Sequence, residues 1–96
     1  MIELDPEKDA ANIAKHGVSL SRSSEVDLRA ALINGAHPGD DGEARWIAYG
    51  HLADRLHVLI FTIRRERIRA ISLRKANRRE QKYAVLRMTS PNRIGP

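Results

Sequence analysis

Residues 44–75 read ARWIAYGHLADRLHVLIFTIRRERIRAISLRK, and this stretch decides the fold. Over residues 44–50 the pattern has a period of two, which is that of a β-strand with two different faces. Residues 56–63 form a nearly continuous run of β-branched and other apolar residues, which indicates a strand covered on both faces. Residues 67–74 give a third strand. Because the connections are short, we predict an antiparallel meander.

The alternation also assigns side chains to the faces of the first of these strands. Arg45, Ile47 and Tyr49 share one face, whereas Trp46 and Ala48 share the other. We expect both aromatic residues to pack in the core. The alternative for each is stacking on a nucleic-acid base.

A short strand and two helices are predicted before the meander. Residues 1–4 give the strand, and residues 6–16 give a helix that begins after a capping Asp5 and ends at Gly17. A second helix is predicted from Ser19 to about residue 33. The expected buried stripe of the first helix is made of small and β-branched residues: Ala10, Ile13, Ala14 and the following Val18.

The last predicted helix starts at Asn77, with Glu80 three residues later as in a capping box, and extends to about Met88. Between the second helix and the meander, residues 35–42 have the composition of an exposed loop. The fold class is thus α+β, a two-layer sandwich in one domain of residues 1–88. Residues 89–96 are predicted to be a disordered tail.

The composition excludes several classes of protein and of site. A chain of 96 residues suits one domain, and it has no cysteine, so neither a disulfide framework nor a thiolate metal site is available. The four histidines lack the paired spacing of a zinc motif. The longest apolar run, residues 58–61, is far too short to span a membrane. We expect a cytoplasmic protein that needs no metal or other cofactor and has no membrane partner.

The charge is divided lengthwise. Residues 1–43 carry nine acidic and four basic side chains, whereas residues 44–96 carry thirteen basic and three acidic ones. Ten of these bases lie between Arg64 and Arg87. Such a concentration is typical of a surface that meets phosphates, so RNA or DNA is the first partner to consider. For any single arginine, the alternative is a solvated surface position.

Two arginines near the ends of the second and third meander strands are the leading candidates for phosphate binding. Antiparallel pairing should bring Arg64 and Arg74 close together, and a guanidinium group matches phosphate oxygens in a planar fork. We expect Arg67 and Arg69 to share one strand face and Arg74 to lie on the other.

Two other residues could move protons. His16 lies at a helix C-terminus, where the helix dipole stabilises a protonated imidazole, and it could also act as a general acid or base. Glu43 and Arg45 stand two apart at a strand entrance and could form an ion pair. Alternatively, Glu43 could accept a proton near a scissile phosphate.

The sequence resembles a known family in several fragments that occur in order. The fragments are Glu3-Leu4-Asp5-Pro6-Glu7-Lys8, Asn12, Lys15-His16-Gly17-Val18-Ser19, Gly42-Glu43-Ala44-Arg45, Gly50, Thr62-Ile63-Arg64, Arg69 to Ala76, Glu80 and Tyr83. They are similar to the landmarks of BrnT-type toxins of type II toxin–antitoxin modules, over residues 2–85. The resemblance implies a RelE-like ribonuclease fold and a toxin that cleaves RNA and inhibits translation.

The resemblance also implies partners. These are a cognate BrnA-like antitoxin with a ribbon-helix-helix domain, an RNA substrate, and operator DNA that is bound only through the antitoxin. Two toxins and two antitoxins would form a heterotetramer.

The mechanism we expect is attack of a ribose 2′-hydroxyl on the adjacent phosphate. Arg64 and Arg74 would stabilise charge, and His16 or Glu43 would transfer protons. The backbone of the RNA would be held by Lys15, Arg45, Arg69 and Arg78. The rival interpretation is a non-catalytic basic module that binds nucleic acid or an acidic protein segment.

Overall fold

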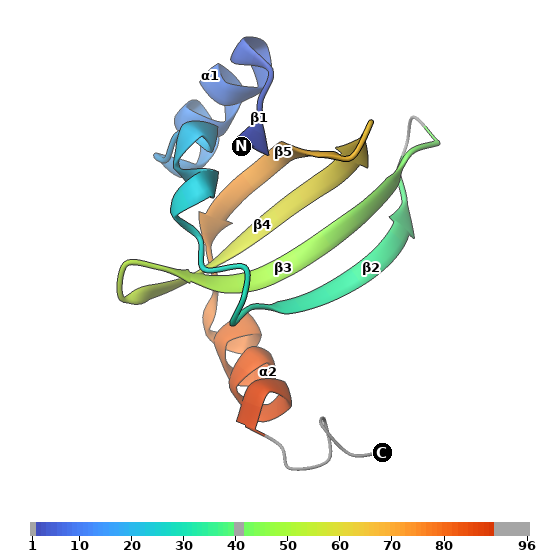
Figure 1. Cartoon of the computed structure of the whole chain (residues 1–96). Coiled ribbons are helices and arrows are strands. Elements are labelled where there is room, and N and C mark those ends of the chain that lie inside the picture. The colour runs from blue at the N-terminus through green and yellow to red at the C-terminus, as the bar shows by residue number, and fades with distance from the viewer. Residues whose placement is uncertain (1, 40–41, 90–96) are drawn as a thin grey trace.

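The computed structural model describes residues 2–39 and 42–89. The elements follow in the order β1 (Ile2–Glu3), α1 (Pro6–His16), the 3₁₀ helix η1 (Leu20–Glu25), β2 (Leu32–Pro38), β3 (Ala44–Leu52), β4 (Arg55–Arg64), β5 (Arg67–Lys75) and α2 (Arg78–Thr89). Figure 1 shows α1 and η1 beside the β1–β5 side of a twisted sheet, and α2 continuing from the end of β5. The predicted α+β class is confirmed.

The sheet has five strands in the order β1-β5-β4-β3-β2. β1 runs parallel to β5, and every other neighbouring pair is antiparallel, so the predicted meander is confirmed as β3, β4 and β5. In the turn between β4 and β5, Arg64 pairs with Arg67. Arg65 and Glu66 between them have φ values of 50° and 66°. Two left-handed residues form the kind of turn whose twist fits an antiparallel hairpin.

The predicted second helix, from Ser19 to about residue 33, is wrong. Only Leu20–Glu25 is helical, as a single 3₁₀ segment. The Ser19 hydroxyl does accept the amide of Ser21, at 3.1 Å. Ser24 Oγ then donates to the carbonyl of Ser21, at 3.3 Å. Serine side chains that bond to nearby backbone groups offer an alternative to the helical ladder, which explains why the helix does not continue.

The strand that replaces the end of that helix is β2. It pairs with β3 from Leu32 opposite Tyr49 to Pro38 opposite Ala44, with a register shift between Asn34 and His37. Part of the predicted loop of residues 35–42 therefore lies in the sheet. Residues 40–41 of that loop are outside the described residues.

The sheet has a hydrophobic cluster on each face. The cluster on the η1 face consists of Leu20, Val26, Ala48, Leu52, Leu59, Phe61, Ala70 and Leu73. The cluster on the α2 face consists of Leu56, Val58, Ala76 and Ala84, with Ile47, Tyr49, Ile60 and Met88 packed against it. β4 contributes buried residues to both clusters, so the prediction of a strand covered on both faces is confirmed.

The predicted aromatic packing is also confirmed for Trp46. Its ring stacks on Phe61 in the η1-face cluster, with the ring centroids 6.1 Å apart. Tyr49 packs against the other cluster, and its ring meets Tyr83 of α2 edge-on at 5.4 Å. The predicted alternation along β3 is therefore correct.

Helix α1 has the predicted bounds, but of its predicted buried stripe only Val18, which follows the helix, packs against the η1-face cluster. Asp5 caps the helix by accepting the amide of Glu7, and Gly17 ends it with φ of 74°. Ile13 is 47% exposed, and Ala10 and Ala14 are exposed as well. The helix instead turns a polar residue toward the sheet.

That residue is Asn12, which is buried and bonds to the edge of β5. Its amide nitrogen donates to the carbonyl oxygens of Leu73 and Val18, at 2.8 Å each, and its amide oxygen accepts the backbone N–H of Leu73, at 3.2 Å. Within the part of the chain that the structure describes, β1 pairs with β5 at Ile68 and Arg69 alone. Because the sheet edge beyond β1 would otherwise leave backbone groups buried and unpaired, a side-chain amide serves here as a substitute strand.

Helix α2 begins with the predicted capping box. The amide of Glu80 donates to Asn77 Oδ1 at 2.8 Å, and Glu80 Oε1 accepts the amide of Asn77 at 3.0 Å. The helix includes Thr89; the rest of the predicted tail, residues 90–96, lies outside the described residues. In the described part of the chain, no helix has the length and apolar character needed to cross a membrane.

Replacing Asn12 with leucine tests the substitute strand. The Asn12→Leu variant keeps the side-chain size but leaves the backbone groups of Leu73 and the carbonyl of Val18 without their partner. We expect it to lose about 2–3 kcal/mol of unfolding free energy in urea denaturation, because unpaired buried polar groups keep their desolvation penalty. Ile13→Ala, next to it on the exposed side of α1, is the control and should lose less than about 1 kcal/mol. Equal losses in the two variants would contradict this role of Asn12.

Candidate functional site

A β-bulge places most of the sheet arginines on one face. On β5, Ile68, Ala70 and Leu73 all contact the η1-face cluster, although their sequence positions change from even to odd. The change occurs where the register skips Ile71, between Ile60 opposite Ser72 and Phe61 opposite Ala70. In a strand without the bulge, even-numbered residues would have stayed on the η1 face throughout.

The bulge corrects one prediction. Arg67, Arg69 and Arg74 all lie on the α2 face of the sheet, whereas we expected Arg74 on the opposite face. Arg64 is paired with Arg67, so its side chain lies on the same face. With Arg45 on β3, these residues define what we call the basic face: Arg45, Arg64, Arg67, Arg69 and Arg74.

The predicted convergence of Arg64 and Arg74 is wrong. Arg64 pairs with Arg67 at the hairpin turn, whereas Arg74 pairs with Val58, six residues earlier on β4. At about 3.3 Å per strand residue, the two guanidinium-bearing positions are about 20 Å apart along the sheet. They share a face but lie at opposite ends of it.

A hollow of about 300 Å³ opens between α1 and the basic face, and we call it the α1 hollow. Helix α1 contributes Lys8, Lys15 and His16 to its wall, and the sheet contributes Arg45 and Ser72. No acidic side chain is among its described lining residues. The α1 hollow therefore joins a histidine to several cations, which is an environment that attracts anions.

His16 in this hollow favours its neutral form. Partial burial, the neighbouring charge of Lys15 and the charge of Arg74 together hold the pKa of His16 below its ordinary value of 6.5. These effects outweigh the helix dipole, which we expected to favour the protonated ring. A neutral imidazole near pH 7 can accept a proton. Arg74 is not among the described residues that line the hollow, but its charge contributes to this lowering.

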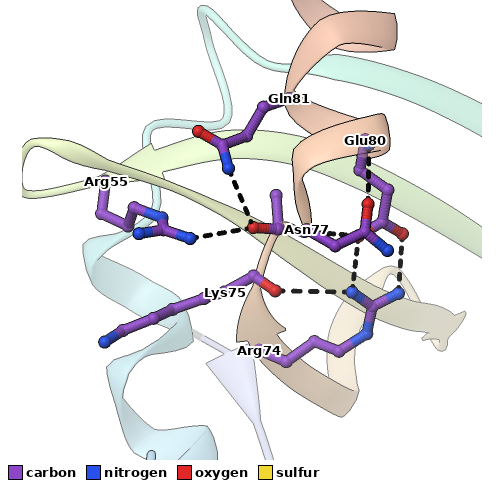
Figure 2. A network of polar contacts seen from close by, with 7 residues as sticks. Arg55, Arg74, Lys75, Asn77, Glu80 and Gln81 are labelled. Atoms are coloured by element: carbon purple, nitrogen blue, oxygen red, sulfur yellow. Dashed lines mark hydrogen bonds and ion pairs between the residues drawn. The ribbon is translucent and has the colours of Figure 1, made fainter.

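Arg74 is held in place by Glu80. Nη1 and Nη2 of Arg74 donate to the two carboxylate oxygens of Glu80, at 2.7 and 2.8 Å. Figure 2 shows that the same carboxylate reaches the amide of Asn77, so one side chain both caps α2 and fixes the arginine. The hydrogen bonds from Arg74 lower the pKa of Glu80, and the carboxylate raises that of Arg74.

Further contacts brace the junction between β5 and α2. Arg55 donates to the carbonyl of Ala76 at 3.0 Å, and Gln81 donates to the same oxygen at 3.3 Å (Figure 2). Arg74 and Glu80 are 30% and 19% exposed, so the ion pair is partly shielded from water. The Arg74 side chain is therefore held in one position by its ion pair with Glu80, which is itself fixed at the start of α2.

A second hollow lies at the other end of the basic face, and we call it the hairpin hollow. It measures about 680 Å³ and is lined by Glu3, Arg64, Arg65, Arg67 and Arg69. Glu43 accepts two hydrogen bonds from Arg64 here, each of 2.7 Å. Glu43 is thus bound at the hairpin end and does not line the α1 hollow.

The remaining predicted residues are divided between these places. Lys15 and Arg45 line the α1 hollow, and Arg69 lines the hairpin hollow. Arg78 lines a separate depression on α2, together with Lys82. The described residues contain no group of three side chains that could hold a metal ion.

Lys8 and Ser72 also line the α1 hollow, but they were not among the predicted site residues. Lys8 could have been found, because it stands seven residues before Lys15 and so lies on the same side of α1. Ser72 could not, because the face that it occupies depends on the bulge at Ile71.

Comparison with known proteins agrees with the resemblance. Residues 4–80 match a family model described as "Ribonuclease toxin, BrnT, of type II toxin-antitoxin system". A search of curated proteins gave no match. Because the family match extends over most of the sequence, including α1, strands β2 to β5 and the Arg74–Glu80 pair, the chain belongs to the BrnT family of ribonuclease toxins of type II toxin–antitoxin systems.

Proposed function

We propose that this toxin is an endoribonuclease that cuts RNA in the α1 hollow by using its own side chains, without a metal ion. The observation that carries the proposal is the meeting of His16, whose pKa is lowered, with Lys8, Lys15 and Arg45 in one hollow that contains no described acidic residue. A phosphodiester would be attracted there, and a proton acceptor would stand beside it.

The chemistry needs two functions from the protein. His16 accepts the proton of the ribose 2′-hydroxyl as that oxygen attacks the adjacent phosphorus, and the bond from phosphorus to the 5′ oxygen breaks. The products are a 2′,3′-cyclic phosphate and a 5′-hydroxyl, whose proton comes from water. Arg45 and Arg74 stabilise the charge that grows on the phosphorane oxygens.

The roles of Arg64 and Glu43 differ from our first expectation. The pair lies at the hairpin end, about 20 Å along the sheet from Arg74, and neither residue is among the described residues that line the α1 hollow. We therefore assign proton transfer to His16 and not to Glu43, and charge stabilisation to Arg74 and Arg45 and not to Arg64.

The biological role follows from the family. A type II toxin has a cognate protein antitoxin. For this chain we propose a BrnA-like antitoxin with a ribbon-helix-helix domain, two copies of each protein in the complex, and contact with operator DNA only through the antitoxin. Cleavage of RNA in the cytoplasm would inhibit translation when the toxin is released.

The pH dependence of RNA cleavage tests the role of His16. Since a general base must be neutral, activity should rise with pH through the pKa of His16, and this limb should lie below pH 6.5 because the folded protein lowers that pKa. His16→Ala should reduce kcat about 100-fold or more and remove the limb. His51→Ala, which changes an exposed histidine on β3, is the control. An unchanged acid limb in His16→Ala would eliminate His16 as the base.

Cleavage in excess chelator tests the assignment of the arginines and the independence from metal. The wild-type rate should be the same with and without EDTA. Arg45→Ala and Arg74→Ala should each lower kcat/KM about 100-fold, because each removes donors to the developing charge. Arg22→Ala, an exposed arginine of η1, should have no effect. Full activity in Arg74→Ala, or RNA that is bound but never cut by the wild type, would refute the proposal; the second result would favour a non-catalytic binding module.

A further inference from the structure

We propose that the hairpin hollow is a second subsite of the toxin, which binds backbone phosphates of the same single-stranded RNA beside the linkage being cut in the α1 hollow. This inference rests on the proposed function. It gives Arg64, Arg65, Arg67 and Arg69 a role in holding the substrate instead of in chemistry.

The two hollows are joined by one row of side chains across the sheet. Thr62 of β4 pairs with Arg69 of β5, and the register that pairs Trp46 with Phe61 continues to place Arg45 opposite Thr62. The backbones of adjacent strands are about 4.8 Å apart, so the Cα atoms of Arg45 and Arg69, on either side of Thr62, are about 10 Å apart. Arg45 lines the α1 hollow and Arg69 lines the hairpin hollow. A strand of RNA can therefore pass from one hollow to the other without leaving the basic face.

In this row of Arg45, Thr62 and Arg69, the guanidinium groups are the groups available to a ligand. Thr62 is buried, with its hydroxyl donating to the carbonyl of Ala44 at 2.8 Å, so it does not compete for a ligand. Arg69 Nε is buried and has no hydrogen-bond acceptor among the residues that the structure describes. A phosphate oxygen next to Arg69 would supply an acceptor for this group of donors.

The charges at the hairpin end favour an anionic ligand. Four arginines line the hollow with one carboxylate, Glu3, whose contact with Arg67 is 3.2 Å long and exposed. Glu66 in the turn and Glu43, which pairs with Arg64, are the other described acidic groups nearby. Exposed ion pairs contribute about 1 kcal/mol or less, so phosphates can replace these carboxylates at small cost.

The residues described as lining the hairpin hollow indicate which part of the RNA this subsite recognises. No aromatic side chain is among the described residues that line the hairpin hollow, so it offers bases no aromatic ring to stack on. The subsite should read the charged backbone and not the sequence, and it should strengthen binding of longer substrates.

Cleavage of short and long oligoribonucleotides tests the subsite. The probes are a three-nucleotide and a twelve-nucleotide RNA with the same cleaved linkage, and the variant is Arg67→Gln with Arg69→Gln. For the long RNA we expect KM to rise about tenfold with kcat unchanged, and the slope of log(kcat/KM) against log[salt] to become shallower by about 0.7 for each lost phosphate contact. The short RNA should show no change.

The control is Arg22→Gln with Arg29→Gln, which removes the same charge from exposed positions outside the basic face. If the double variant does not fold, Arg67→Gln alone serves, because Arg67 is 70% exposed. Equal effects on both RNAs, or no effect on either, would overturn the subsite. A variant that loses only its affinity for the antitoxin would also overturn it. If the wild type cuts neither RNA, the proposed function fails instead.

Discussion

The hydrogen bonds between Asn12 and the backbone of Leu73 fix the position of α1 relative to β5, and the candidate site depends on this arrangement. They complete the edge of β5 where β1 no longer pairs, and they hold α1 against that edge. Lys8, Lys15 and His16 then lie on the side of α1 that meets the sheet, beside Arg45 and Ser72. Without this contact the cations of the helix and those of the sheet would have no common hollow.

A second constraint is the pairing of Arg74 with Glu80. The carboxylate belongs to the first turn of α2 and also satisfies the amide of Asn77, so the orientation of Arg74 is tied to the start of a helix. In a low-dielectric, partly shielded position, such a bidentate pair fixes geometry more than it adds stability. Its cost is that Glu80 competes with phosphate for the same guanidinium group, while the remaining N–H groups of Arg74 can face a ligand.

The basic face as a whole shows how ion pairs and ligand binding share the same arginines. Arg64, Arg67 and Arg74 each meet a carboxylate of the toxin itself. The exposed pairs at the hairpin end are weak, and the pair at the α2 end is more shielded. This difference suits the separate tasks that we propose for the two ends: exchangeable contacts with the RNA backbone at the hairpin, and a fixed charge for the phosphate that is cut.

The meander, the bounds and caps of α1 and the capping box of α2 could be predicted from the sequence, because these depend on local periodicity and on residues within one turn of each other. The sequence also identified His16, Arg45 and Arg74 as functional candidates. Which of these residues lie close together depends on contacts between elements that are far apart in the sequence. The bulge at Ile71 reversed the face of Arg74, the register put Arg64 about 20 Å from it, and the edge of β5 selected Asn12 as the buried residue of α1. Residues 19–33 were misjudged for the same reason, since pairing with β3 and burial of Leu20 and Val26 outweighed a weak local preference for helix.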